Sequence, residues 1–260
     1  MILFHSFRSG SGRTFIAANV AGLLALQGRR VGLVDANFNR PSIHHFVNLN
    51  EGEINHSLYD YLTGKCTILQ AAVDVTGRLP AEIHPPLKEN VAGSLFIVPG
   101  HTNFGAFSPV MNAQFGSFVA QGRSELVEGL KLDVLLVDVM DGWNEQTMML
   151  AGVCKALVSV LKMDMQDYQF TASFIDSARE LGVPQVVTVA NLVPHGQKLE
   201  RIEQQLRDTY HTPEAFAVPY ASQVLENAGQ GLFVYSRAEN PVSLALGRLA
   251  HAVDAINERA

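Results

Sequence analysis

Short apolar runs alternate along the chain with longer stretches in which apolar residues recur every three or four positions. The short runs predict buried strands, and the wider spacing predicts helices with one face against a core. Because strands and helices alternate, the pattern favours a parallel sheet that is covered by helices on both faces. The predicted strands are residues 2–4, 31–34, 95–98, 134–137, 156–161, 185–190 and 216–218, and the predicted helices are residues 14–27, 56–62, 67–73, 115–130, 166–181, 198–210 and 241–257.

The alternation continues from residue 2 to residue 257 without an internal repeat, a low-complexity tract or a linker. A chain of 260 residues is within the range of one large domain. We therefore expect residues 1–260 to form a single doubly wound α/β domain with a mostly parallel sheet. The segment 78–90 contains Pro80, Pro85 and Pro86 and predicts a loop inside that domain.

Composition narrows the class of protein. Hydrophobic residues make up 47% of the chain and charged residues 17%, which excludes disorder for the chain as a whole. The net charge of −6 argues against a surface that binds nucleic acid everywhere. There is no run of 18 apolar residues and no secretory signal pattern, and Cys66 and Cys154 alone make neither a disulfide framework nor a four-cysteine zinc site. We expect a cytoplasmic protein.

A glycine-rich loop follows the first predicted strand and leads into the first predicted helix. Gly10 and Gly12 let backbone N–H groups close around a phosphate group, and the helix start behind them favours an anion. Thr14 supplies a hydroxyl for Mg²⁺, and Arg13 stands where a phosphate-binding P-loop has a lysine. On these residues alone, a plain glycine-rich turn between strand and helix explains the loop equally well.

The remaining motifs favour the phosphate loop, because together they resemble the MinD/ParA family of P-loop ATPases, the deviant-Walker-A group. The family loop K-G-G-x-G-K-T is similar to residues 8–14, and the family strand that ends in D-x-D is similar to residues 33–37. Further blocks follow in family order and at family spacing. They are residues 39–44, 57–64, 95–100, the Walker B strand 134–138, residues 189–191, 218–220 and 231–234.

This resemblance implies a P-loop nucleoside-triphosphatase fold that binds ATP and Mg²⁺ between two protomers of a homodimer. It assigns nucleotide contacts to Arg8, Ser9, Gly10, Ser11, Gly12, Arg13, Thr14 and Phe15, with Asn191 on the base. It assigns Mg²⁺ to Thr14, with Asp35 and Asp138 behind it. The residues expected to act in hydrolysis are Arg8, Arg13, Asp35 and Asn37, with Arg8 reaching the nucleotide of the partner protomer.

Three departures from the family pattern lie at the expected active centre. Arg8 replaces the signature lysine and Arg13 the P-loop lysine, and an arginine fork is wider and planar. Asn37 replaces the second aspartate of D-x-D, and an amide is a far poorer proton acceptor than a carboxylate. Phosphoryl transfer depends mostly on positioning and on charge. We therefore expect hydrolysis to be slowed more than binding is weakened.

The resemblance also bears on partners. MinD proteins end in a basic amphipathic helix that lies on the membrane, and this sequence stops at the end of its last predicted core helix, so we expect no such anchoring. DNA binding of the ParA type needs a basic face. Such a face could draw on Arg201, Arg207, Arg237 and Arg248, although scattered surface arginines are the commoner explanation.

These observations lead to one main hypothesis and two alternatives. The main hypothesis is a positioning, partitioning or regulatory ATPase with weak hydrolysis, which uses the nucleotide to control dimerisation and the binding of an unidentified protein partner. The first alternative is a pseudo-ATPase scaffold of the same fold. The second is a metabolic enzyme that resembles dethiobiotin synthetase, and it would need a substrate pocket with catalytic residues of its own.

Overall fold

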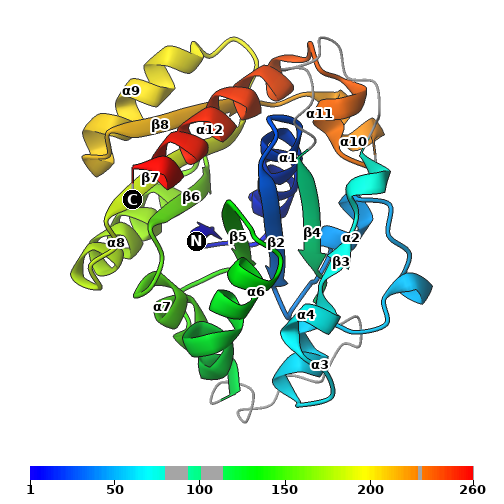
Figure 1. Cartoon of the computed structure of the whole chain (residues 1–260). Helices are drawn as coiled ribbons and strands as arrows, with labels where there is room; N and C mark the ends of the chain where they lie inside the picture. Colours follow the sequence, from blue (N-terminus) through cyan, green and yellow to red (C-terminus); the bar gives the residue numbers. More distant parts are fainter. Residues whose placement is uncertain (80–92, 101–113, 228–229, 260) are drawn as a thin grey trace.

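The computed structural model describes residues 1–79, 93–100, 114–227 and 230–259. Within these residues, eight strands form one sheet in the order β3-β4-β2-β5-β1-β6-β7-β8 (Figure 1). Neighbouring strands are parallel except for β3, which pairs with β4 in the antiparallel sense. The strands are β1 (Ile2–His5), β2 (Arg30–Ala36), β3 (Val73–Asp74), β4 (Ser94–Val98), β5 (Val134–Val139), β6 (Ala156–Lys162), β7 (Gln185–Val193) and β8 (Glu214–Pro219).

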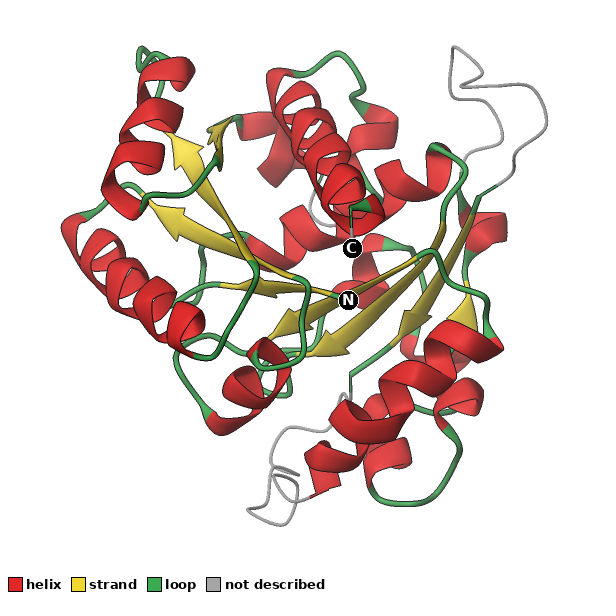
Figure 2. Cartoon of the chain, turned by 60° about the vertical axis from the view of Figure 1, so that its left-hand side comes forward, coloured by secondary structure: helices red, strands yellow, loops and turns green. Residues whose placement is uncertain are grey.

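Helices cover both faces of the sheet (Figure 2). One face packs against α1 (Arg13–Leu26), α2 (Ile43–Phe46), α10 (Ser222–Glu226), α11 (Phe233–Ser236) and α12 (Pro241–Glu258). The other face packs against α3 (Leu58–Leu62), α4 (Ile68–Ala71), α6 (Arg123–Gly129), α7 (Glu145–Ala151), α8 (Met165–Glu180) and α9 (Leu199–Tyr210). Short 3₁₀ turns lie at Glu51–Glu53 and Thr76–Arg78, and a π-helical turn at Phe118–Gly122 precedes α6.

The two-sided core explains why the strands are apolar at nearly every position. Successive side chains of a strand point to opposite faces. In β1, Ile2 and Phe4 therefore enter the core under α1 and α12, while Leu3 enters the core under α8. All three side chains are fully buried, as a parallel sheet with two covered faces requires.

The fold class predicted from the sequence is confirmed, and each of the seven predicted strands is present. The sequence pattern missed the two-residue edge strand β3 and four helices of seven residues or fewer, which are α2, α7, α10 and α11. Gly28, expected to end the first helix, has a φ of 90°, the left-handed conformation that favours glycine. Of the loop expected at 78–90, all but the first two residues lie outside the described part of the chain.

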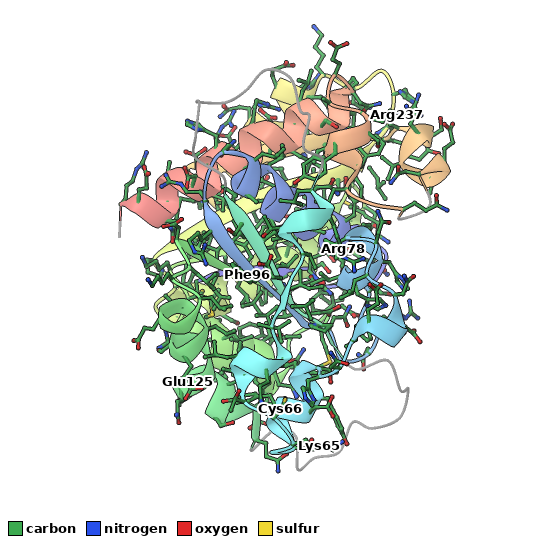
Figure 3. All side chains as sticks on the ribbon, turned by 45° about the vertical axis from the view of Figure 1, so that its right-hand side comes forward. Lys65, Cys66, Arg78, Phe96, Glu125 and Arg237 are labelled. Atoms are coloured by element: carbon green, nitrogen blue, oxygen red, sulfur yellow. The ribbon has the colours of Figure 1, made fainter. Side chains whose placement is uncertain are left out.

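Side chains fill the space between sheet and helices (Figure 3). Cys66 lies beside Lys65 in the region of α3 and α4, whereas Cys154 is buried, and both cysteines are free thiols. Within the described residues, none of the helices combines the length and the apolar character that crossing a membrane requires.

The strand order places the carboxyl end of β1 at the centre of the molecule. β1 lies between β5 and β6, so the chain leaves it at the point where successive connections turn to opposite sides of the sheet. Ligands of open α/β sheets bind at such a switch point. The glycine-rich loop at 8–12 begins there, and Asp35 of β2 is paired in register with Asp138 of β5 on the neighbouring strands.

Candidate functional site

The glycine-rich loop holds α1 with its amino end facing a cavity. Gly10 and Gly12 have φ values of 74° and 82°, and helical hydrogen bonding begins with the bond from Ile16 N to Gly12 O. No side chain caps this end of the helix. The first N–H groups of α1 therefore lack intrahelical acceptors, and together with the helix dipole they favour an anion.

Asn191, at the carboxyl end of β7, fixes the shape of this loop. Its side-chain amide nitrogen donates to Ser11 O at 2.8 Å, and the residue is only 4% exposed. A Cβ atom on Gly12 would lie 2.3 Å from that same nitrogen, so a side chain there would displace the Asn191 amide from the loop, and the φ of 82° itself favours glycine. The role of Asn191 in binding the base stays a prediction, but its support of the loop is a contact that the sequence did not reveal.

Arg13 and Thr14, the first residues of α1, both bind Asp138. Arg13 Nε pairs with one carboxylate oxygen, and the hydroxyl of Thr14 donates to the other at 2.6 Å. Arg13 Nη1 also donates to Ser6 Oγ at 3.0 Å. With Arg13 at 5% and Asp138 at 0% exposure, this is a buried ion pair. The charge of Arg13 is thus already balanced within the chain.

Asp35 lies next to Asp138 and organises the turn that follows β2. Its carboxylate accepts backbone N–H bonds from Asn37 at 3.1 Å, Ser42 at 2.8 Å and Ile43 at 3.0 Å. Burial, and then the nearby charge of Asp138, raise the pKa of Asp35 to about 7. The site therefore contains two neighbouring carboxylates on adjacent strands, with Arg13 on one and three backbone donors on the other.

A cavity of about 240 Å³, here called the loop cavity, opens over the glycine-rich loop. Asn37 is 7% exposed and lines it, and its side-chain oxygen has no hydrogen-bond partner within the described residues. Sequence reasoning missed two charged residues of the wall, Arg40 and Asp141. Arg40 is the positively charged residue of the sequence block 39–44. Its charge within a block that resembles the family could have indicated a place near the phosphates. The lining residues are Ser6, Ser9, Gly10, Ser11, Gly12, Arg13, Thr14, Phe15, Asn37, Arg40, Ser42, Phe46 and Asp141.

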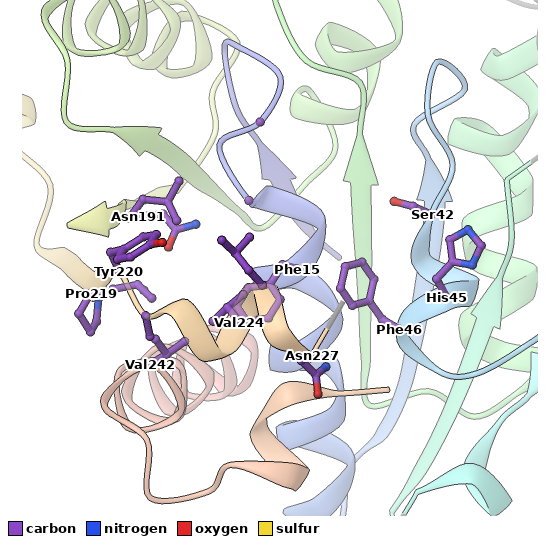
Figure 4. Close-up of a pocket in the computed structure, with 16 residues that line it drawn as sticks. Phe15, Ser42, His45, Phe46, Asn191, Pro219, Tyr220, Val224, Asn227 and Val242 are labelled. Carbon is purple, nitrogen blue, oxygen red and sulfur yellow. The ribbon is translucent and has the colours of Figure 1, made fainter. Parts of the chain in front are cut away.

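A second cavity of about 490 Å³, the apolar cavity, adjoins the first (Figure 4). Its wall combines Phe15 and Phe46 with residues around β8, α10 and the start of α12, most of which sequence reasoning missed. Those residues are Val218, Pro219, Tyr220, Ala221, Val224, Leu225, Asn227 and Val242, and Asn191 and Leu192 contribute from β7. Gly10, Gly12, Phe15, Ser42 and Phe46 line both cavities, so the two adjoin each other at the amino end of α1.

Arg8 lies outside both cavities and binds α8 and the residue that caps it in its own chain. It pairs with Asp164 and Asp167, and its Nη1 donates to Gln166 Oε1 at 2.9 Å. The hydrogen bond with Asp167, followed by the charges of both carboxylates, raises the pKa of Arg8 above its usual value. Phe7 stacks on Phe170 of the same helix with ring centres 4.1 Å apart. The expected contact of Arg8 with a partner's nucleotide stays a prediction.

Thr14, Asp35 and Asp138, which we expected at Mg²⁺, suit a cation that receives most of its ligands from the nucleotide and water. The Thr14 hydroxyl donates a hydrogen bond to Asp138, so the lone pairs of its oxygen stay available for a cation. Within the described part of the chain, no group of three or more His, Cys, Asp or Glu side chains could hold a metal ion. Mg²⁺ commonly takes only one or two protein ligands beside phosphate and water, which agrees with this arrangement.

Three features together define a P-loop nucleotide-binding fold. They are the glycine-rich loop after β1, the uncapped amino end of α1, and the carboxylates at the ends of β2 and β5. The family model of the CobQ/CobB/MinD/ParA nucleotide-binding domain matches residues 2–234. The chain therefore belongs to this family, as the order of its sequence blocks predicted. Comparison with curated protein sequences gives no match.

Solved structures of the same fold include cell-division ATPases. The MinD structure from Pyrococcus furiosus is 17% identical, with 98% of each chain covered and a TM-score of 0.77. The MinD complex with Mg-ADP from Pyrococcus horikoshii is 19% identical, with 97% of this chain and 95% of that chain covered and a TM-score of 0.74. The MinC:MinD complex from Aquifex aeolicus is 17% identical, with 97% of this chain and 94% of that chain covered and a TM-score of 0.73. At these identities the likeness establishes the fold.

Proposed function

We propose that the protein is a cytoplasmic ATP-binding switch of the positioning or partitioning kind, which dimerises around the nucleotide, binds a protein partner and hydrolyses ATP weakly. One observation carries this proposal: the loop cavity and the apolar cavity adjoin each other at the amino end of α1. The loop cavity offers backbone donors to phosphates, and the apolar cavity offers aromatic and aliphatic walls to a base.

Mg²⁺ would enter with the nucleotide and supply positive charge at the phosphates. Thr14 would be its ligand from the protein, with Asp138 accepting the hydrogen bond of the Thr14 hydroxyl and Asp35 behind it. Support comes from the bond between Thr14 and Asp138. Further support comes from the relative in Pyrococcus horikoshii, which was solved with Mg-ADP.

Weak hydrolysis follows from two features of the loop cavity. Asn37 lines the cavity with an amide where the family has a carboxylate, so a water held there gains no strong proton acceptor. The Nε and Nη1 atoms of Arg13 are directed to Asp138 and Ser6, so less of its charge serves the phosphates. The pairing of Arg13 also favours the second candidate, a scaffold that binds ATP without hydrolysing it.

Dimerisation through Arg8 would require this side chain to exchange its contacts. Arg8 now pairs with Asp164 and Asp167 of its own chain, and it is about one third exposed. A guanidinium at the surface can exchange carboxylates for phosphate oxygens, with which it pairs in the same bidentate manner. The Aquifex aeolicus complex of MinD with MinC supports the proposal of a protein partner.

Sedimentation equilibrium with and without a slowly hydrolysed ATP analogue tests this switch. We expect the analogue with Mg²⁺ to increase the dimer fraction of the wild type. Arg8→Ala should reduce that increase by tenfold or more in the dimerisation constant, on the scale of lost charge pairs at interfaces. Arg259→Ala, which removes an exposed arginine at the end of α12, is the matched control. An equal monomer–dimer balance in all conditions would contradict the dimer model.

A further inference from the structure

The two arginines at the family's cation positions are both engaged with carboxylates of this chain. Arg13 is paired with Asp138 in a buried bond, and Arg8 is paired with Asp164 and Asp167 on the far side of the loop. A nucleoside triphosphate carries several negative charges, and the backbone donors of the loop do not neutralise them. Mg²⁺ would balance part of this charge. A further side-chain cation from the same protomer would balance more of it, and neither Arg13 nor Arg8 is free to do so in this structure.

The loop cavity favours such a further cation, because Asp141 lines it. This carboxylate follows β5 and adds a negative charge to the wall that phosphates would approach. With the charges of Arg13 and Asp138 cancelling, the remaining charged side chains of the lining are Asp141 and Arg40. Arg40 is thus the cation in the wall whose charge is not already balanced by a contact within the described residues.

Arg40 is exposed, and its side chain makes no hydrogen bond or ion pair within the described residues. Its backbone, by contrast, is fixed. Arg40 N donates to Asn37 O at 3.2 Å, which closes the turn after β2. On either side of that turn, the carboxylate of Asp35 holds the N–H groups of Asn37 and Ser42. The turn therefore presents Arg40 at the rim of the cavity without further ordering of the main chain.

We propose that Arg40 binds the phosphates of the bound nucleotide and takes over the charge that Arg13 gives to Asp138. This inference rests on the proposed nucleotide site and adds a residue that the family motif does not assign. Arginine suits the task, because its planar fork forms paired bonds with phosphate oxygens. Asp35 then acts on the nucleotide indirectly, because it holds the turn that carries Arg40.

Isothermal titration of the full chain with ATP and with adenosine, both with Mg²⁺ present, tests this proposal. We expect Arg40→Ala to weaken ATP binding by about 10- to 100-fold, the range for a hydrogen bond to a charged group. Adenosine, which lacks phosphates, should bind the variant as it binds the wild type. Arg40→Lys should recover part of the loss, and Arg259→Ala should bind ATP as the wild type does.

Two further readouts distinguish a phosphate contact from a structural role. ATP affinity of the wild type should fall more steeply with salt than that of Arg40→Ala, because one screened charge pair is lost. Asp141→Asn should strengthen ATP binding, since it removes a repelling charge from the same wall.

The outcomes separate this inference from the proposed function. If the wild type binds ATP and Arg40→Ala binds it equally well, Arg40 has no role at the phosphates and the nucleotide site stands. If Arg40→Ala weakens ATP and adenosine alike, its effect is on the shape of the cavity, and the phosphate contact is wrong. If the wild type binds neither ligand, the proposed function fails, and this inference fails with it.

Discussion

Arg13 and Arg8 flank the glycine-rich loop, and the structure places them in different environments. Arg13 is 5% exposed and pairs with a fully buried Asp138, whereas Arg8 is 32% exposed and pairs with Asp164, which is 44% exposed, and with the buried Asp167. Removing one partner of a buried pair leaves an uncompensated charge away from water. An exposed pair is screened and contributes little. We therefore expect Arg13 to stabilise the fold, and we expect Arg8, whose side chain reaches the surface, to be able to exchange its partners.

The largest effect expected from this comparison is on stability. Arg13→Met should lower the free energy of unfolding by about 3–5 kcal/mol, because Asp138 keeps a buried charge without its partner. Urea denaturation followed by circular dichroism measures this. The double variant Arg13→Met/Asp138→Asn should recover part of the loss, since both charges are then absent. An Arg13→Met protein as stable as the wild type would show that the pair is not buried in solution.

The next effect is a dependence of stability on pH that originates at Asp35. Its pKa is raised to about 7 in the folded protein, above the unfolded value near 3.8, so the folded state binds this proton more tightly. The contribution of Asp35 to stability is therefore greatest below about pH 4 and is lost as pH rises through about 7. As pH rises from about 4 to about 7, the free energy of unfolding of the wild type should fall by on the order of a few kcal/mol relative to that of Asp35→Asn.

This pH dependence also sharpens the comparison between the two arginines. Arg13→Met leaves the charge of Asp138 uncompensated beside Asp35, so the loss of stability with rising pH should extend to higher pH. Arg8→Ala should leave the profile unchanged, because neither Asp164 nor Asp167 is among the groups that shift the pKa of Asp35. Urea denaturation at several pH values between 5 and 8 gives both profiles. A flat profile for the wild type would contradict the raised pKa.

A smaller effect is expected on turnover. Asn37→Asp places a carboxylate in the wall of the loop cavity, and a positioned proton acceptor should raise the rate of ATP hydrolysis by about tenfold or more. Phosphate release under saturating ATP measures it, with ATP binding checked by titration. If the variant binds ATP and its turnover is unchanged, the assignment of residue 37 to the attacking water is wrong.

The smallest effect is expected for Arg8→Ala in the monomer. Asp164 is 44% exposed, and the buried Asp167 keeps its bond from Lys162 N at 2.9 Å, so the loss should be smaller than at Arg13, whose partner Asp138 is fully buried. Without nucleotide, the unfolding temperature of Arg8→Ala should fall only slightly, and by much less than that of Arg13→Met. A clear drop in the unfolding temperature would mean that Arg8 is a structural residue like Arg13, and the contrast between them would disappear.

The sequence predicted the strands well, because a sheet buried on both faces needs apolar runs such as those of β5 and β6. It failed on short helices such as α7, although Asn144 caps that helix by accepting from Thr147 N and was a usable signal. The pairing of Arg13 with Asp138, 125 residues away, could not be predicted. Motif spacing places Arg13 and Asp138 at one end of the sheet, but only packing decides whether the guanidinium turns to the carboxylate or to the phosphates.

The aromatic wall of the apolar cavity was equally out of reach for sequence reasoning. Phe15 and Phe46 meet residues such as Tyr220 and Val242 there, and these four are spread over most of the chain. Side chains from such distant segments share a cavity only because α12 packs against both α1 and β8 in the folded protein. No local pattern identifies them.

The central claim is that the two adjoining cavities bind ATP although Arg13 is held by Asp138. Thermal unfolding of the wild type with ATP and Mg²⁺ tests it most directly. We predict that ATP raises the unfolding temperature in a concentration-dependent manner. Ligand at one hundred times its dissociation constant should stabilise the folded state by about 2.7 kcal/mol. An unfolding curve that millimolar ATP and Mg²⁺ leave unmoved would contradict the claim.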